Sequence, residues 1–173
     1  MNSIDICAIR NREKILTKEF ILHVDKWDSM DEDIKRIVSR KWSNIKYLND
    51  DGELSSEISK LPDDKGGIYI FLLSPDLING LHRYIMYVGR ARRQADFSLQ
   101  KRCRHYIRDT RPLIAEMVGN WGKYLYLYYL PLDSDDEIIK VERELNRVII
   151  PPCNSQIPDR YVAIDQNNKL AFT

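Results

Sequence analysis

The chain has 173 residues, of which 43% are hydrophobic and 31% are charged, and its formal net charge is +1. This composition is typical of a globular protein with one domain and a sizeable core. No apolar run approaches the roughly 20 residues that cross a membrane, and the charged amino terminus lacks a signal-peptide core. We therefore expect no membrane partner and a cytoplasmic location. The three cysteines are scattered without a Cys-x-x-Cys pair, which favours reduced thiols over disulfides or a zinc site.

Residues 1–65 predict an extension that is mostly helical. Asp31 can cap a helix, and the apolar residues after it recur at three- and four-residue spacing, so we predict a helix over residues 30–48. The stretches NDDGELSSE and LPDDKGG that follow have the chemistry of loops.

Residues 66–155 predict a compact α+β core. Apolar strands are expected at 67–73 and 83–89, a helix at 98–109, a shorter helix from Pro112 to Gly119, and a strand at 122–132. Ser134 can cap a last helix that ends near Val148, before two prolines. This order predicts a small three-stranded antiparallel sheet flanked by helices, with residues 156–173 as a tail packed on the core.

Glu142 is a charged residue close to the apolar face of the last predicted helix. At 100° per residue it lies about 60° from the centre of the apolar face. A carboxylate in apolar surroundings must be paired, metal-bound or protonated. Both a structural ion pair with an arginine and a metal site remain open, with Glu144 at the edge of the same face.

The helix at 98–109 places Arg102 beside its apolar face, whereas Arg104 and Arg108 point further out. An arginine at the border of a core either snorkels to solvent or clamps a phosphate, because its planar fork matches phosphate oxygens. Tyr69 and Tyr87 stand near glycines on neighbouring strands. Glycine weakens a strand unless another backbone or a ligand approaches closely.

These motifs resemble the signatures of the GIY-YIG nuclease family. Gly67-Ile68-Tyr69 resembles the first signature, and Tyr87-Val88-Gly89 the second with valine in place of isoleucine. Asn154 follows Glu142 by twelve residues across a turn that contains Pro151, which is similar to the family's glutamate-to-asparagine spacing.

The resemblance covers roughly residues 66–155. It identifies Arg102 with the family's helix arginine, although the stretch after Gly89 is longer than usual and leaves Arg104 as the alternative. Tyr106 occupies the place, one turn later, where many members carry histidine.

This resemblance implies a divalent-metal-dependent DNA endonuclease, most simply a site-specific enzyme of restriction, mobile-element or defence type. Its implied catalytic residues are Tyr69, Tyr87, Arg102, Glu142 and Asn154. Glu142 would hold Mg²⁺ or Mn²⁺, and Tyr69 would orient or deprotonate the attacking water. The alternatives are a structure-specific repair or recombination nuclease and an inactive nucleic-acid-binding module.

A basic band supports a DNA partner. Residues 81–112 carry nine Lys and Arg against two Asp, and phosphate contacts dominate the affinity of proteins for DNA. Gly89 and Ala91 would let the backbone of double-stranded DNA come close, and cutting both strands would require a homodimer or two successive events. Residues 1–65 would add DNA contacts. The predicted DNA-binding residues are Arg90, Arg92, Arg93, Lys101, Arg104, His105 and Arg108.

Overall fold

The computed structural model describes residues 16–78, 81–92 and 97–158, and its secondary structure is a mixed α+β arrangement. The strands are β1 (Ser43–Lys46), β2 (Gly66–Leu73), β3 (Tyr84–Ala91) and β4 (Leu125–Leu132). The α-helices are α2 (Val24–Trp27), α3 (Glu32–Val38), α4 (Leu99–Arg104), α5 (Pro112–Trp121) and α6 (Asp135–Ile149). Short 3₁₀ helices are η1 (Ser56–Lys60), η2 (His105–Arg108) and η3 (Gly122–Tyr124).

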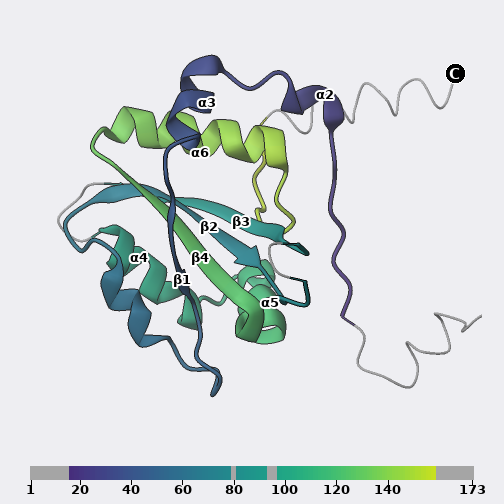
Figure 1. Cartoon of the computed structure of the whole chain (residues 1–173), viewed down its shortest axis with the longest axis vertical. Helices are drawn as coiled ribbons and strands as arrows, with labels where there is room; N and C mark the ends of the chain where they lie inside the picture. Colours follow the sequence, from purple (N-terminus) through teal and green to yellow (C-terminus); the bar gives the residue numbers. More distant parts are fainter. Residues whose placement is uncertain (1–15, 79–80, 93–96, 159–173) are drawn as a thin grey trace, which may run out of the picture.

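The four strands form one antiparallel sheet in the order β1-β4-β2-β3 (Figure 1). The prediction of an α+β core is confirmed, but the prediction of three strands is wrong because β1 pairs with the outer edge of β4. Ser43 lies opposite Tyr129 and Lys46 opposite Tyr126.

The predicted helix over residues 30–48 is therefore also too long. Asp31 does cap α3, since its side chain accepts hydrogen bonds from the backbone N–H groups of Asp33 and Ile34. The helix ends at Val38, where the Trp42 indole donates to the Val38 carbonyl at 2.8 Å. Loops, η1 and β1 follow, so the described part of the extension is not mostly helical.

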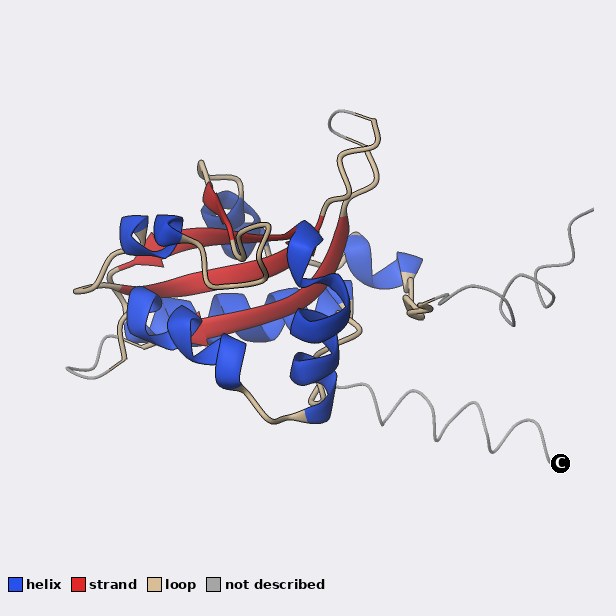
Figure 2. Cartoon of the chain, turned by 90° about the horizontal axis from the view of Figure 1, so that it is seen from below, coloured by secondary structure: helices blue, strands red, loops and turns tan. Residues whose placement is uncertain are grey.

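Helices cover both faces of the sheet (Figure 2). Because side chains alternate along a strand, Ile68 and Ile70 pack on the side of α3 and α6, whereas Tyr69 and Phe71 face α4 and α5. Two hydrophobic cores result, one on each face of the sheet. Strand β3 lies at one edge of the sheet. Among the described residues, no helix has both the length and the apolar character required to cross a membrane.

The long helix α6 follows its sequence signals closely. Ser134 accepts a hydrogen bond from the Glu137 backbone N–H, and the helix ends where Ile150 adopts a left-handed conformation with φ of 53°. The two prolines then turn the chain back toward β3. Of the predicted tail, residues 156–158 are described, and Ile157 is buried against the core; residues 159–173 lie outside the described residues.

Candidate active site at the edge of strand β3

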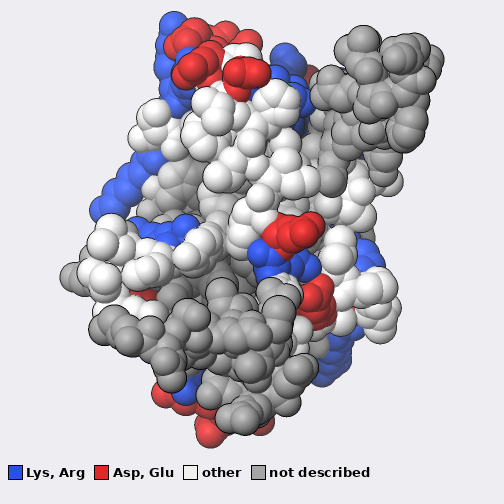
Figure 3. All heavy atoms as spheres, turned by 90° about the vertical axis from the view of Figure 1, so that its right-hand side faces the viewer, with Lys and Arg blue, Asp and Glu red and all other residues white. Residues whose placement is uncertain are grey.

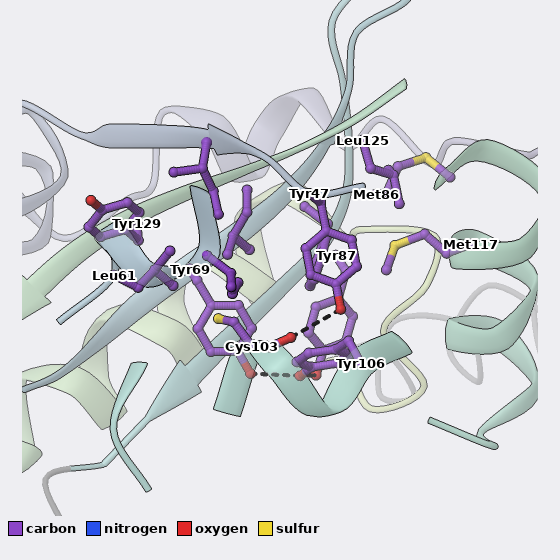
Figure 4. Close-up of a cluster of buried hydrophobic side chains, with 14 of the residues drawn as sticks. Tyr47, Leu61, Tyr69, Met86, Tyr87, Cys103, Tyr106, Met117, Leu125 and Tyr129 are labelled. Carbon is purple, nitrogen blue, oxygen red and sulfur yellow. Dashed lines mark hydrogen bonds between the residues drawn. The ribbon is translucent and has the colours of Figure 1, made fainter. Parts of the chain in front are cut away.

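The pairing of β2 with β3 brings the two signature tyrosines together. Tyr69 lies opposite Gly89, and Phe71 lies opposite Tyr87, so the tyrosines are diagonal neighbours with ring centroids 6.5 Å apart. Both rings point toward α4 (Figure 4). The two tyrosines therefore lie on the same side of the sheet.

The two signature glycines make room for protein atoms. A Cβ on Gly89 would lie 2.6 Å from the ring of Tyr69, which is fully buried. A Cβ on Gly67 would lie 2.3 Å from the Leu130 carbonyl oxygen, and Gly67 has a φ of +154°. In the structure, Gly89 therefore makes room for the Tyr69 ring, and Ala91 is itself buried. The expected approach of a DNA backbone at these two residues stays a prediction.

A chain of hydrogen bonds links the tyrosines through Tyr106 (Figure 4). Tyr106 Oη donates to Tyr87 Oη at 3.2 Å and lies 2.6 Å from Tyr69 Oη. Because Tyr106 has a single hydroxyl proton, Tyr69 is the donor in the shorter bond. Arg102 Nε donates to Tyr69 Oη at 3.3 Å and lies over the Tyr106 ring. The donor order is thus Arg102, Tyr69, Tyr106 and Tyr87.

Burial controls the protonation of these phenols. It raises the pKa of Tyr69 well above the ordinary value of 10, and the Arg102 charge offsets only part of this effect. Burial also raises the pKa of Tyr106. At neutral pH both side chains are therefore hydrogen-bonding phenols. Arg102 is the cation that donates a hydrogen bond to Tyr69.

Glu142 reaches the same edge from the opposite layer. It forms an ion pair with Arg90 of β3, and both side chains are largely shielded from solvent. Burial raises the pKa of Glu142, and Arg90 counteracts this rise. The ion-pair alternative left open by the sequence is thus realised here, with a partner 52 residues away.

Glu144, the alternative carboxylate, is engaged elsewhere. It binds the Arg147 guanidinium at 2.6 and 2.9 Å and accepts a hydrogen bond from the Asp31 backbone N–H. These contacts join α6 to the start of α3. Glu144 therefore has a structural position away from the tyrosines.

One pocket of about 340 Å³ gathers four of the five predicted catalytic residues at the β3 edge. Tyr69, Tyr87, Arg102 and Glu142 all line it, although they come from four separate elements. The remaining lining residues are Arg90, Ala91, Arg92 and Phe97. Arg104 is exposed and does not line this pocket, which agrees with the helix rotation used to separate it from Arg102.

Asn154 secures the strand that carries Tyr87. Its side-chain amide accepts from the Val88 N–H at 2.9 Å and donates to the Val88 carbonyl at 2.8 Å. The neighbouring Cys153 N–H donates to the Met86 carbonyl. The turn after α6 thereby covers part of the β3 edge. The twelve-residue spacing is the length of chain that leads from Glu142 on α6 to this contact. Asn154 therefore holds β3 against the turn that follows α6.

The predicted DNA-binding residues that the structure describes differ in their surroundings. Arg92 lines the pocket, and Arg90 is paired with Glu142. The exposed residues on α4 and η2 are Lys101, Arg104, His105 and Arg108, and Arg93 lies outside the described residues. On the face at the right of Figure 1, the described acidic and basic side chains are interspersed (Figure 3).

The fit of a divalent cation depends on Glu142. Within residues 16–78, 81–92 and 97–158, no group of three or more His, Cys, Asp or Glu side chains could hold a metal ion. Glu142 is, however, a carboxylate lining the pocket, and Mg²⁺ is commonly bound by one carboxylate with water and substrate phosphates. The donor set fits an ion that binds together with a phosphate, provided that Arg90 moves off the carboxylate.

Tyr106 is the site residue whose importance the sequence analysis missed. Its place one turn after Arg102, on the same helix face, was the feature of the sequence that predicts proximity to Tyr69.

The chain matches no family model, and searches of curated proteins and solved structures found no match either.

Proposed function

We propose that this chain is a divalent-metal-dependent DNA endonuclease that hydrolyses phosphodiester bonds at specific sites. The observation that carries the proposal is the convergence of Tyr69, Tyr87, Arg102 and Glu142 in one pocket. The sequence signatures of GIY-YIG nucleases select the same four residues independently of their positions in space. A restriction, mobile-element or defence role accords with such an enzyme.

Arg102 is suited to a phosphate in this pocket. It uses Nε for Tyr69, and its Nη groups have no hydrogen-bond partner among the described residues. Those groups are available for phosphate oxygens, where a preorganised cation stabilises the charge that develops in the transition state. Mg²⁺ or Mn²⁺ held by Glu142 would supply charge stabilisation at the leaving oxygen.

The hydroxyl chain gives Tyr69 a way to accept a proton without first becoming an isolated phenolate. Tyr69 Oη receives one hydrogen bond from Arg102 and retains a second lone pair for a water. As a proton arrives from that water, Tyr69 passes its own proton to Tyr106, and Tyr106 passes one to Tyr87. The Tyr87 hydroxyl proton then moves to an oxygen of the bound phosphate or to solvent. Each tyrosine oxygen gains one proton as it loses another, and the water that has lost its proton forms the new bond to phosphorus as the bond to the leaving oxygen breaks.

Digestion of a supercoiled plasmid tests the proposal. With Mg²⁺, discrete fragments would support a site-specific endonuclease, whereas cleavage confined to branched DNA would favour the repair or recombination alternative. Glu142→Gln should abolish cleavage and leave DNA binding largely intact, and Glu144→Gln is the matched control on the same helix. Full activity of Glu142→Gln would remove Glu142 from the mechanism.

A second candidate is a nucleic-acid-binding module without catalysis. The ion pair of Arg90 with Glu142 favours it, because it neutralises the only carboxylate that lines the described pocket. DNA binding without cleavage in either Mg²⁺ or Mn²⁺ would support this candidate over the endonuclease.

A further inference from the structure

A second, larger groove adjoins the candidate active site. It has a volume of about 980 Å³ and lies between α6, the first turn of α5 and residues 153–158. Figure 1 shows the segment after α6 running down beside β3 toward α5. Tyr87, Arg90 and Glu142 line both this groove and the smaller pocket. A strand of DNA with its scissile phosphate in the pocket would therefore continue into the groove.

The groove contains an unsatisfied polar group. Asn146 lies one turn after Glu142 on α6 and is only 3% exposed, yet its Oδ1 atom has no hydrogen-bond partner among the described residues. Leaving a buried acceptor unpaired is unfavourable, and such groups are rare in folded proteins. The carbonyl oxygen requires a donor, and the N–H groups on the edge of a nucleobase are donors.

The opposite wall favours an anion. Helix α5 has ten residues, and its N-cap residue Arg111 provides no side-chain hydrogen bond to the first turn. The positive end of the helix dipole therefore faces the groove without a capping side chain. On the α6 side of the groove, Arg143 adds a charge that has no ion pair within the described part of the chain, whereas Arg111 is bound to Asp109 and Arg90 to Glu142.

Apolar side chains complete the lining, among them Leu113, Ile139 and Ile157. A ligand for this groove thus combines a negative charge, a hydrogen-bond donor and an apolar surface. A nucleotide has all three properties, since its phosphate is anionic, its base edge carries N–H groups and its base faces are apolar.

We propose that this groove is a substrate subsite for the nucleotide next to the scissile phosphate, with the phosphate near Arg143 and the α5 N-terminus and the base edge at Asn146. The proposal rests on the proposed nuclease function for the direction of the strand. Its binding chemistry is independent of whether the bond is cut.

The test measures DNA binding in EDTA, so that cleavage does not enter. A dye-labelled short single-stranded oligonucleotide is compared with one of equal length whose nucleotides are abasic. Asn146→Leu should weaken binding of the first roughly 3- to 10-fold and leave binding of the second unchanged. Arg143→Ala should weaken both and lower the salt dependence by about one phosphate contact. Arg36→Ala, on α3 outside the groove, is the matched control.

Thermal unfolding separates a binding role from a structural one. An asparagine retained for a ligand should be dispensable for folding, so Asn146→Leu should unfold at the same temperature as the parent protein or higher. A lower unfolding temperature, equal weakening with both oligonucleotides, or unchanged binding by both groove variants would each overturn the subsite. An intact subsite in a protein that never cleaves DNA would instead refute only the nuclease proposal.

Discussion

The contact between Gly89 and Tyr69 allows a direct test of why glycine occupies this strand. A Cβ at position 89 would lie 2.6 Å from three atoms of the Tyr69 side chain. Ordinary carbon contacts are about 3.5–4.0 Å, so the ring must retreat by about 1 Å. Tyr69 is fully buried, and Arg102 and Tyr106 hold its hydroxyl group, so a retreat of the ring disturbs both of these hydrogen bonds.

We therefore expect Gly89→Ala to destabilise the protein. Overpacking of a close-packed core costs about 1–3 kcal/mol. For a protein of this size, that cost lowers the unfolding temperature by roughly 2–12 °C. If the protein is a nuclease, its activity should fall as well, because the Tyr69 hydroxyl leaves its place in the hydrogen-bond chain.

Circular dichroism during thermal and urea unfolding measures the effect. Gly119→Ala is the matched control, since Gly119 is exposed on α5 and a Cβ there would meet no atom within 4 Å. Both substitutions restrict the unfolded chain alike, and alanine in a helix is favoured by up to about 1 kcal/mol. The control should therefore raise stability while Gly89→Ala lowers it.

A double substitution identifies the cause. In a Tyr69→Ala background the ring is absent, so adding Gly89→Ala should have little further cost. The reasoning would be refuted if Gly89→Ala alone were as stable as the parent protein. If that stable variant also bound DNA more weakly, the glycine would serve approach of the ligand, as the sequence alone had suggested.

Three other sets of variants test the site. Above pH 10 a tyrosine in the unfolded chain loses its proton, whereas buried Tyr69 keeps it. This group should therefore leave the stability unchanged below pH 10 and lower it as the pH rises further. Urea unfolding midpoints measured between pH 8 and 11 should fall less steeply in Tyr69→Phe than in the parent protein. In single-turnover cleavage, Arg102→Ala should lower the rate several hundredfold or more, which is about the effect of removing a preorganised donor, and Arg104→Ala should lower it less. Tyr106→Phe should slow the chemical step without weakening DNA binding. If Arg104→Ala lowered the rate more than Arg102→Ala, the catalytic role would belong to Arg104. Arg90→Gln removes the cation that is paired with the Glu142 carboxylate. Calorimetry without DNA should therefore detect tighter Mn²⁺ binding than in the parent protein. An unchanged affinity for Mn²⁺ would show that the ion pair does not oppose metal binding.

The sequence by itself determined the local elements of the core. Ser134, the apolar spacing of α6 and the prolines after it predicted that helix within one or two residues, because capping and periodicity depend on neighbouring residues. Short apolar runs and alternating residues likewise predicted β2, β3 and β4. The spacing from Glu142 to Asn154 was visible for the same reason, since it spans one helix end and one turn.

Only the tertiary structure decided β1. Trp42, Ile45 and Leu48 continue the helical spacing of α3, so local pattern favoured a longer helix. The free edge of β4 offered backbone hydrogen bonds instead, and Ile45 became buried opposite Leu127. Pairing with a strand some 80 residues later has no signal within the segment itself.

The tertiary structure also decided the partners of the site residues. Which arginine pairs with Glu142, which ring fills the space above Gly89 and which acceptor of α6 remains unsatisfied all depend on how the two helical layers meet at the β3 edge. The sequence determines which side chains each element presents. The packing of those elements determines the distances between them, and ion pairs, steric contacts and pKa values follow from these distances.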